Sequence, residues 1–283
     1  MTAPAERARI DSPPVPANKY ALPRASLRFL PRLERESDHP TAWEFPSVLC
    51  DEPAWLAELR RLYADPLCFP ASLSPQAGLL LHALVLNVRP RVVVETGSFL
   101  GASTLWMGGA IAESSKLKAQ RSSQAREAPA GLSPSLHCFD DFGPIKPGPW
   151  RGGGFEGDRL SLVRERVARA GLGERVTLYR GDSATELVRA RDGLKQLGGV
   201  DVAFLDGDHT VEGATRDLWA VEPVLNTGGY VVLHDTLPEQ CGGHAGPRHV
   251  VDRINAITQG LYEACELHLA PLNYGLAVLR RIG

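Results

Sequence analysis

The sequence predicts an α/β protein built on a doubly wound, seven-stranded, mostly parallel sheet with helices on both faces and one antiparallel edge strand. Short β-branched or apolar runs alternate with amphipathic helical stretches from residue 74 to the C-terminus. Glycine turns follow several of these runs. The last two runs are joined by Asn273-Tyr274-Gly275, a short turn typical of an antiparallel pair. In sheets of this class, ligands bind beyond the carboxyl ends of the strands.

The amino-acid composition limits the classes of molecule that this protein is expected to bind. The 283 residues include 31 Lys+Arg and 33 Asp+Glu, a formal net charge of -2, so no global basic field attracts nucleic acid or an anionic membrane. No apolar stretch suits a bilayer span or a secretion signal. The 5 cysteines are odd in number and form no CxxC pair, which favours a reduced compartment. We expect a cytoplasmic protein that binds a small molecule and neither nucleic acid nor a membrane.

The N-terminal quarter differs from the rest of the chain. Residues 1–25 combine proline, alanine and charge with few large apolar side chains, which predicts a mobile arm. Residues 26–73 are interpreted as an N-terminal helical cap, because apolar side chains recur at helical spacing over 52–63. This cap could either pack on the main domain or form a lid over a substrate, and the sequence leaves both roles open. The main domain is expected to span residues 74–283.

The first helix of the main domain is predicted to begin at Ser74-Pro75, since a hydroxyl caps a helix N-terminus and proline suits its first turn. It continues through the apolar run 79–88 and stops at Pro90. The later elements follow from β-branched runs and from helical periodicity. Strands are expected at 92–94, 136–139, 176–179, 202–205, 230–233, 266–270 and 276–280. Helices are expected at 104–111, 158–170, 184–197, 211–225 and 250–262.

Three connections stand out by composition. Residues 114–135 are low in complexity and are interpreted as a solvated loop, with a basic contact surface as the alternative. The Gly-rich segments 143–157 and 240–248 are expected to flank the ligand edge of the sheet. Trp150 and Phe155 in the first of them could close over a substrate or simply pack locally.

The turn after the first strand carries the clearest functional signal, with the sequence Val94-Glu95-Thr96-Gly97-Ser98-Phe99-Leu100-Gly101-Ala102-Ser103. Its glycines are spaced G-x-x-x-G behind a glutamate. A dinucleotide fingerprint requires G-x-G-x-x-G, and a phosphate-binding P-loop requires a lysine. A carboxylate at this position suits a cationic ligand amine and would repel a pyrophosphate.

This stretch resembles motif I of class I S-adenosylmethionine-dependent methyltransferases, and the resemblance implies their Rossmann-like domain over residues 74–280. It places Asp140 on the ribose hydroxyls and Gly181-Asp182-Ser183 on the adenine side. Asp141 could take the ribose role, and Asp140 could instead form a turn within the chain. The cofactor-binding residues implied by the resemblance are Glu95, Gly97, Ser98, Gly101, Ser103, Asp140, Asp182 and Asp206.

Two apolar strands end in acids, Asp206 after residues 202–205 and Asp235 after residues 231–234. Adjacent parallel strands would bring both carboxylates to one edge of the sheet, where they repel each other. Mg²⁺ would relieve this repulsion, because it binds oxygen ligands and keeps several waters. Alternatively, Asp206 caps the next helix and Asp235 orients neighbouring backbone.

The segments around these acids resemble small-molecule O-methyltransferases related to the catechol type and to macrolide-sugar methyltransferases. The resemblance assigns Asp206 and Asp235 to the metal, but the third ligand position is Thr236, a weaker ligand. It also places His209 where catechol-type enzymes carry a lysine base, and imidazole suits the removal of a hydroxyl proton near neutral pH. The alternative for His209 is a helix-start histidine hydrogen-bonded to Asp208 or Glu212. His234 is interpreted as a histidine satisfied within the sheet, with a ligand role as the alternative.

The resemblance implies transfer of a methyl group from S-adenosylmethionine to a hydroxyl oxygen of a small natural-product-like acceptor, assisted by Mg²⁺ and by His209 as base. Relatives of this kind are commonly dimers, which implies a homodimer here. A cephalosporin-hydroxylase-type oxidoreductase is an alternative, because such enzymes resemble the same methyltransferases. A non-catalytic nucleoside-binding protein is a further alternative.

Overall fold

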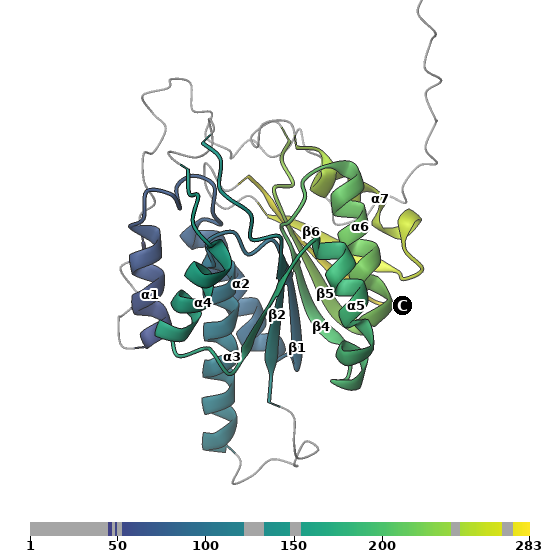
Figure 1. Ribbon diagram of the computed structural model, residues 1–283. Helices are drawn as coiled ribbons and strands as arrows, with labels where there is room; N and C mark the ends of the chain where they lie inside the picture. The colour runs from purple at the N-terminus through teal and green to yellow at the C-terminus, as the bar shows by residue number, and fades with distance from the viewer. Residues whose placement is uncertain are drawn as a thin grey trace, which may run out of the picture.

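The structure is a computed structural model that describes residues 45–46, 49, 53–121, 133–147, 154–238, 244–267 and 274–283. A central sheet separates two layers of helices (Figure 1). The helices of the first layer are α1 (Ala54–Tyr63), α2 (Pro75–Val88), α3 (Ala102–Arg121) and α4 (Arg159–Arg169). The helices of the second layer are α5 (Ser183–Gln196), α6 (Val211–Val221) and α7 (Gly246–Ile257). None of the helices in these ranges is both long and apolar enough to cross a membrane.

The sheet has seven strands in the order β3-β2-β1-β4-β5-β7-β6, which confirms the predicted doubly wound α/β class. The strands are β1 (Val92–Thr96), β2 (Ser135–Asp140), β3 (Val176–Arg180), β4 (Val200–Leu205), β5 (Leu225–His234), β6 (Tyr262–Leu267) and β7 (Leu276–Arg281). β1 to β5 pair in parallel, and the reversed strand is β7, one place in from the edge. The chain order reverses between β1 and β4, where such sheets bind their ligands.

Strand register sets the position of the site. Thr96 lies opposite Leu205, and Leu205 lies opposite Leu233, so β1, β4 and β5 end level with one another. The residues that follow these three ends are Gly97, Asp206 and Asp235, and His234 is the last residue of β5. The register therefore brings the three sequence motifs to one point on the sheet edge.

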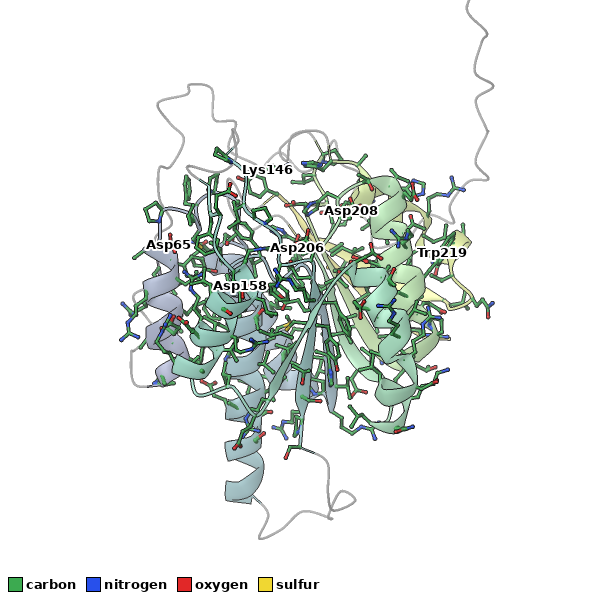
Figure 2. The ribbon with its side chains drawn as sticks, in the orientation of Figure 1. Asp65, Lys146, Asp158, Asp206, Asp208 and Trp219 are labelled. Atoms are coloured by element: carbon green, nitrogen blue, oxygen red, sulfur yellow. The ribbon has the colours of Figure 1, made fainter. Side chains whose placement is uncertain are left out.

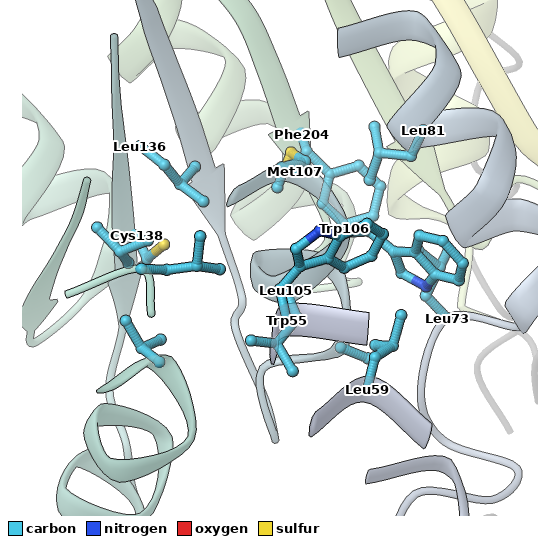
Figure 3. Packing of buried hydrophobic residues seen from close by; sticks show 14 of the residues in the cluster. Trp55, Leu59, Leu73, Leu81, Leu105, Trp106, Met107, Leu136, Cys138 and Phe204 are labelled. Carbon is cyan, nitrogen blue, oxygen red and sulfur yellow. The ribbon is translucent and has the colours of Figure 1, made fainter. Parts of the chain in front are cut away.

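The first helical layer packs on the sheet through a large aromatic core. Trp106 of α3 is fully buried and lies near Trp55 of α1, with 5.9 Å between the ring centroids (Figure 3). A Cβ at Gly109 would meet the Trp55 ring at 2.4 Å, so glycine is needed for α1 to approach α3 this closely. The part of the predicted N-terminal cap that the structure describes thus shares its core with the main domain, which favours packing over closure for α1. The predicted arm, residues 1–25, lies outside the described residues.

Several element boundaries differ from the sequence prediction, and the largest differences are at α3, β5, α7 and β6. The loop predicted from residue 114 is wrong over its first part, because α3 continues to Arg121. Ser114 and Ser115 lie within the helix, where their hydroxyls donate to the carbonyl oxygen of Ile111, and the residues that follow are good helix formers. α7 begins at Gly246 inside the predicted 240–248 loop, with Pro247 in its first turn, and ends at Ile257. As a result, β6 starts at Tyr262, four residues before its predicted start.

Candidate functional site

A cavity of about 440 Å³ lies at the carboxyl ends of the parallel strands. Figure 2 labels Asp206 and Asp208 at this end of the sheet. The cavity brings together the predicted residues Gly97, Asp140, Asp182, Asp206, His209 and Asp235. Four other predicted cofactor residues, Glu95, Ser98, Gly101 and Ser103, are not part of its wall.

Gly97 lets the first turn lie directly against the end of β4. Its φ of +81° belongs to the left-handed region, and a Cβ on it would meet the carbonyl oxygen of Asp206 at 2.1 Å. The neighbouring Asp206 N–H donates to the carbonyl oxygen of Thr96 at 3.0 Å, which fixes this approach. Only glycine fits here, because any side chain would collide with the backbone at the end of β4.

Glu95 stabilises this turn through hydrogen bonds from the turn and from the start of α3. Its side chain is fully buried, and its carboxylate accepts hydrogen bonds from Ser98 Oγ at 2.9 Å, Ser103 Oγ at 2.5 Å and Thr104 Oγ1 at 2.5 Å. Burial raises the pKa of Glu95, and these hydrogen bonds oppose the rise. The three hydroxyls thus engage the carboxylate that the sequence analysis assigned to a ligand amine. Glu95, Ser98 and Ser103 shape the turn rather than the cavity surface.

Asp140, at the end of β2, has its carboxylate saturated by the protein. Oδ2 accepts from the Phe99 N–H at 2.9 Å, and Oδ1 accepts from the Phe142 N–H at 2.6 Å. Arg159 adds a bond to each oxygen, at 3.3 and 2.6 Å. A carboxylate offers about four acceptor positions, and all four are used. The turn-forming role that the sequence left open for Asp140 is therefore present.

Asp141 differs from its neighbour in exposure. Its side chain is 73% exposed and lines the cavity. Both of its hydrogen bonds, from the Gly143 N–H and from Arg159, go to Oδ1, and neither goes to Oδ2.

The sequence analysis missed Arg159, which donates to both acids although it lies 18 or 19 residues away in the chain. In the sequence, Arg159 is recognisable only as a residue in the first turn of a predicted helix, and that position does not predict a contact with Asp140 or Asp141.

At the adenine side predicted from sequence, Asp182 is the N-cap of α5 and accepts the Thr185 N–H at 3.0 Å. It also pairs with Arg216 at 2.7 Å, and its half-exposed side chain lines the cavity. Asp182 therefore has a local structural role beside any contact with a ligand.

The predicted acids meet in a cluster with two histidines. His209 Nε2 lies 3.2 Å from Asp206 Oδ1 and 3.0 Å from Asp235 Oδ2. His234 Nδ1 lies 3.3 Å from Asp206 Oδ1 and 3.1 Å from Asp235 Oδ1. Each imidazole thus bridges both carboxylates.

Opposite charges dominate the electrostatics of the cluster. Burial alone would raise the pKa of Asp206, but the charge of His234 and the hydrogen bonds from both histidines lower it to about 2. Burial alone would lower the pKa of His209, but its bonds to Asp206 and Asp235 raise it to about 10. The charges of the same two acids likewise raise the pKa of His234 to about 9 against its burial. Without another cation, the two imidazoles balance the charge of the two carboxylates.

The alternatives left open for Asp206 and His209 differ from what the structure shows. Thr210, not Asp206, caps α6, because its side chain accepts the Gly213 N–H. His209 contacts the two strand-end acids. Asp235 has a φ of +57°, unusual for a side chain other than glycine, and this turn directs its carboxylate to the cluster.

The two histidines occupy different sides of the cluster. His209 is 26% exposed, lines the cavity and lies beside His244, with 5.4 Å between the ring centroids. His234 is only 3% exposed. The cavity therefore gives a bound molecule access to His209.

The two aromatic residues of the 143–157 segment have different outcomes. Trp150 lies outside the described residues, whereas Phe155 forms a backbone bridge with Ile145 and packs against the core.

Asp217 of α6 is a buried acid close to the site. Its Oδ1 accepts the Ser183 hydroxyl at 2.7 Å, and its side chain packs against Gly207. Burial raises its pKa from 3.8 to about 6, although hydrogen bonds from Ser183 and Thr96 oppose the rise. Ionisation of Asp217 therefore costs more free energy in the folded chain than in the unfolded chain.

We expect Asp217→Asn to stabilise the protein at high pH. A raised folded-state pKa means that the stability contributed by the neutral acid is complete below pH 3.8 and is lost as the pH rises through about 6. Two pK units correspond to about 3 kcal/mol, so the variant should gain up to that free energy of unfolding at pH 8 and much less near pH 4. Urea denaturation at both pH values measures the difference. Equal effects at the two pH values would contradict the assignment.

Comparisons with known proteins agree with this arrangement. A family model described as a methyltransferase domain matches residues 94–236. Among solved structures, cofactor-bound Rv0187 from MTB is 19% identical with a TM-score of 0.56, covering 83% of this chain and 92% of its own. An O-methyltransferase from Bacillus cereus in complex with SAH is 16% identical with a TM-score of 0.54, covering 84% and 94%. TomG from Streptomyces achromogenes, an O-methyltransferase of tomaymycin synthesis in complex with SAM, is 18% identical with a TM-score of 0.55, covering 84% and 93%.

Proposed function

The chain belongs to this family of methyltransferases, and from that premise we propose that it transfers a methyl group from S-adenosylmethionine to a hydroxyl oxygen of a small acceptor. The observation that carries the proposal is the position of the Asp206–His209–Asp235 group beside the Gly97 turn, in the wall of one cavity. The O-methyltransferases similar in fold, with bound SAM or SAH, support the same reaction. A natural-product-like acceptor, a cytoplasmic location and a dimer stay predictions from the sequence.

The cavity fits the cofactor, because it lies at the carboxyl ends of the strands and is lined by Gly97, Asp182 and Asp206. Bound S-adenosylmethionine would supply an electrophilic methyl group on a sulfonium sulfur. We assign its contacts to the Gly97 turn, to Asp182 and to the Asp206 backbone, with Glu95, Ser98, Gly101 and Ser103 holding the turn in shape. Asp141, which is exposed, would accept the ribose hydroxyls. Asp140, which is saturated, would hold the loop through Phe99 and Arg159.

Asp206 and Asp235 would hold a divalent cation, Mg²⁺ in the sequence-based prediction. An oxygen of each carboxylate lies within 4.8 Å of an oxygen of the other, which fits one ion. Such an ion acidifies a hydroxyl bound to it.

His209 would act as the base, since it reaches the cavity from the cluster. The acceptor oxygen forms a bond to the methyl carbon, the bond from that carbon to sulfur breaks, and the hydroxyl proton passes to His209 Nε2. The products are the methyl ether and S-adenosylhomocysteine. The two carboxylates raise the pKa of His209 and so favour its protonated form. A metal cation bound to these carboxylates would offset their charge and leave the neutral imidazole available as the base. In-line alignment of oxygen, carbon and sulfur supplies the rest of the catalysis.

Calorimetric titration with S-adenosylhomocysteine tests the cofactor assignment. We expect low-micromolar binding, about -8 kcal/mol. Asp141→Asn should weaken binding about 10-fold to 100-fold, because each hydrogen bond from a ribose hydroxyl to a charged group contributes about 1.5–3 kcal/mol. Asp140→Asn should mainly lower the free energy of unfolding. No binding by the wild-type chain would refute the proposal, and a loss confined to Asp140→Asn would return the ribose to Asp140. Mass analysis of products separates methylation from the oxygenation expected of a hydroxylase.

A further inference from the structure

Asp217 of α6 is a buried acid that the proposed reaction does not use. It is 2% exposed, and its Oδ1 accepts the Ser183 hydroxyl at 2.7 Å. Ser183 begins α5 and lines the cavity, whereas Asp217 is not part of the cavity wall. A serine hydroxyl has one proton and two acceptor lone pairs. Because the proton goes to Asp217, Ser183 Oγ can offer only an acceptor to a molecule in the cavity.

The surroundings of Asp217 fix the direction of this hydrogen bond. A Cβ on Gly207 would lie 2.8 Å from Asp217 Oδ2, so the backbone after β4 closes over the second oxygen of the carboxylate. Burial raises the pKa of Asp217, but only to about 6, so the side chain is ionised at pH 8. An ionised carboxylate has no proton to donate. The bond therefore runs from Ser183 to Asp217 and cannot reverse.

Asp182, the neighbour of Ser183 in the cavity wall, offers no comparable acceptor. Its Oδ1 accepts from the Thr185 N–H at 3.0 Å, from the Thr185 hydroxyl and from Arg216 at 2.7 Å, and its Oδ2 accepts from Arg216 at 3.3 Å. These bonds use the about four acceptor positions of a carboxylate. Among the hydrogen bonds of the described residues, Ser183 Oγ takes part only as the donor to Asp217. Its lone pairs are thus available to a ligand.

The place of the cofactor is taken from the proposed function, on which this inference rests. That proposal puts the acceptor hydroxyl near Asp206 and Asp235, after β4 and β5, and the ribose near Asp141, after β2. The strand order is β3-β2-β1-β4-β5, and residues 181–183 follow β3. The purine base extends from the ribose on the side away from the sulfur. It would therefore lie beside Ser183.

We propose that Asp217 is a positioning residue that restricts Ser183 Oγ to accepting hydrogen bonds, and that this pair makes the site select a 6-amino purine over a 6-oxo purine. Adenine carries an exocyclic amino group, which donates, whereas a 6-oxo purine carries a carbonyl oxygen there, which only accepts. A carbonyl oxygen opposite Ser183 Oγ would bring two acceptors together. Neither would be satisfied, and an unsatisfied polar group in a binding site costs affinity.

Calorimetric titration of the full chain at pH 8 with S-adenosylhomocysteine and with S-inosylhomocysteine, its 6-oxo analogue, tests the proposal. We expect wild type to bind the adenosine compound at least about 10-fold more tightly. Asp217→Asn should lower this ratio to about 3-fold or less, because the amide can donate to Ser183 and release the hydroxyl proton toward the cavity. Ser183→Ala should lower the ratio as well. The matched control is Ser161→Ala, a serine in the first turn of α4 that donates to Asp158 away from the cavity wall, and it should keep the wild-type ratio.

Several results would overturn the proposal. Equal affinity of wild type for the two compounds does so even if Asp217→Asn fails to fold. A ratio that Asp217→Asn keeps and Ser183→Ala loses would show that Ser183 acts without Asp217. Equal losses of affinity for both compounds in Asp217→Asn would indicate a structural role only. A wild-type chain that binds neither compound refutes the proposed function itself, whereas one that binds both alike refutes only the selection of the base.

Discussion

Replacing His209 with alanine is expected to lower kcat by about 10²–10⁴-fold, the usual contribution of a general base. The imidazole lines the cavity and lies 3.0 Å from Asp235, where an acceptor hydroxyl would approach the metal ligands. Its loss removes the proton acceptor and leaves the Gly97 turn intact. The affinity for S-adenosylhomocysteine should therefore change little, and a methyl-transfer assay together with calorimetry measures both quantities.

His249→Ala is the control for this substitution, because His249 lies on α7 and is not part of the cavity wall. It should keep wild-type turnover. A His209→Ala variant with full kcat would remove His209 as the base. An equal loss of cofactor affinity and of turnover would indicate that His209 supports the cavity instead of taking the proton.

The position of the site could be predicted from sequence because it follows from strand order. Parallel strands that end level bring the backbones of Gly97, Asp206 and Asp235 together, independently of the direction of each side chain. The direction of each side chain is a different matter. Glu95 is not part of the cavity wall, because three hydroxyls engage its buried carboxylate. Ser98 of the turn and Ser103 and Thr104 of α3 donate these bonds, and nothing in the sequence marks them as partners of Glu95.

The cluster of acids and imidazoles shows the same limit. The prediction ended β5 at residue 233, but the strand includes His234, and Asp235 then adopts a left-handed backbone conformation. The alternation of side chains stops there, so His234 and Asp235 both reach the cluster while Thr236 is buried elsewhere. A periodic pattern cannot predict one positive φ on a residue other than glycine. Likewise, nothing local predicts that Arg159 saturates Asp140.

Gly97→Ala is expected to abolish measurable binding of S-adenosylhomocysteine, raising Kd by more than about 100-fold, or about 2.7 kcal/mol. The new Cβ would lie 2.1 Å from the carbonyl oxygen of Asp206, a backbone atom that cannot move aside like the end of a side chain. The β1 turn and the end of β4 must then separate, which displaces Gly97 and Asp206 in the wall of the cavity. Backbone strain at a φ of +81° adds about 1–3 kcal/mol of destabilisation.

Gly171→Ala isolates the strain from the collision. Gly171 has a φ of +71°, and a Cβ there would meet nothing within 4 Å. This variant should lose a similar amount of stability from strain, about 1–3 kcal/mol, and keep its affinity for S-adenosylhomocysteine. Calorimetry at a temperature where both variants are folded, with urea denaturation as the stability measurement, separates the effects. If Gly97→Ala binds as tightly as Gly171→Ala, the close approach of β1 and β4 does not form the cofactor site.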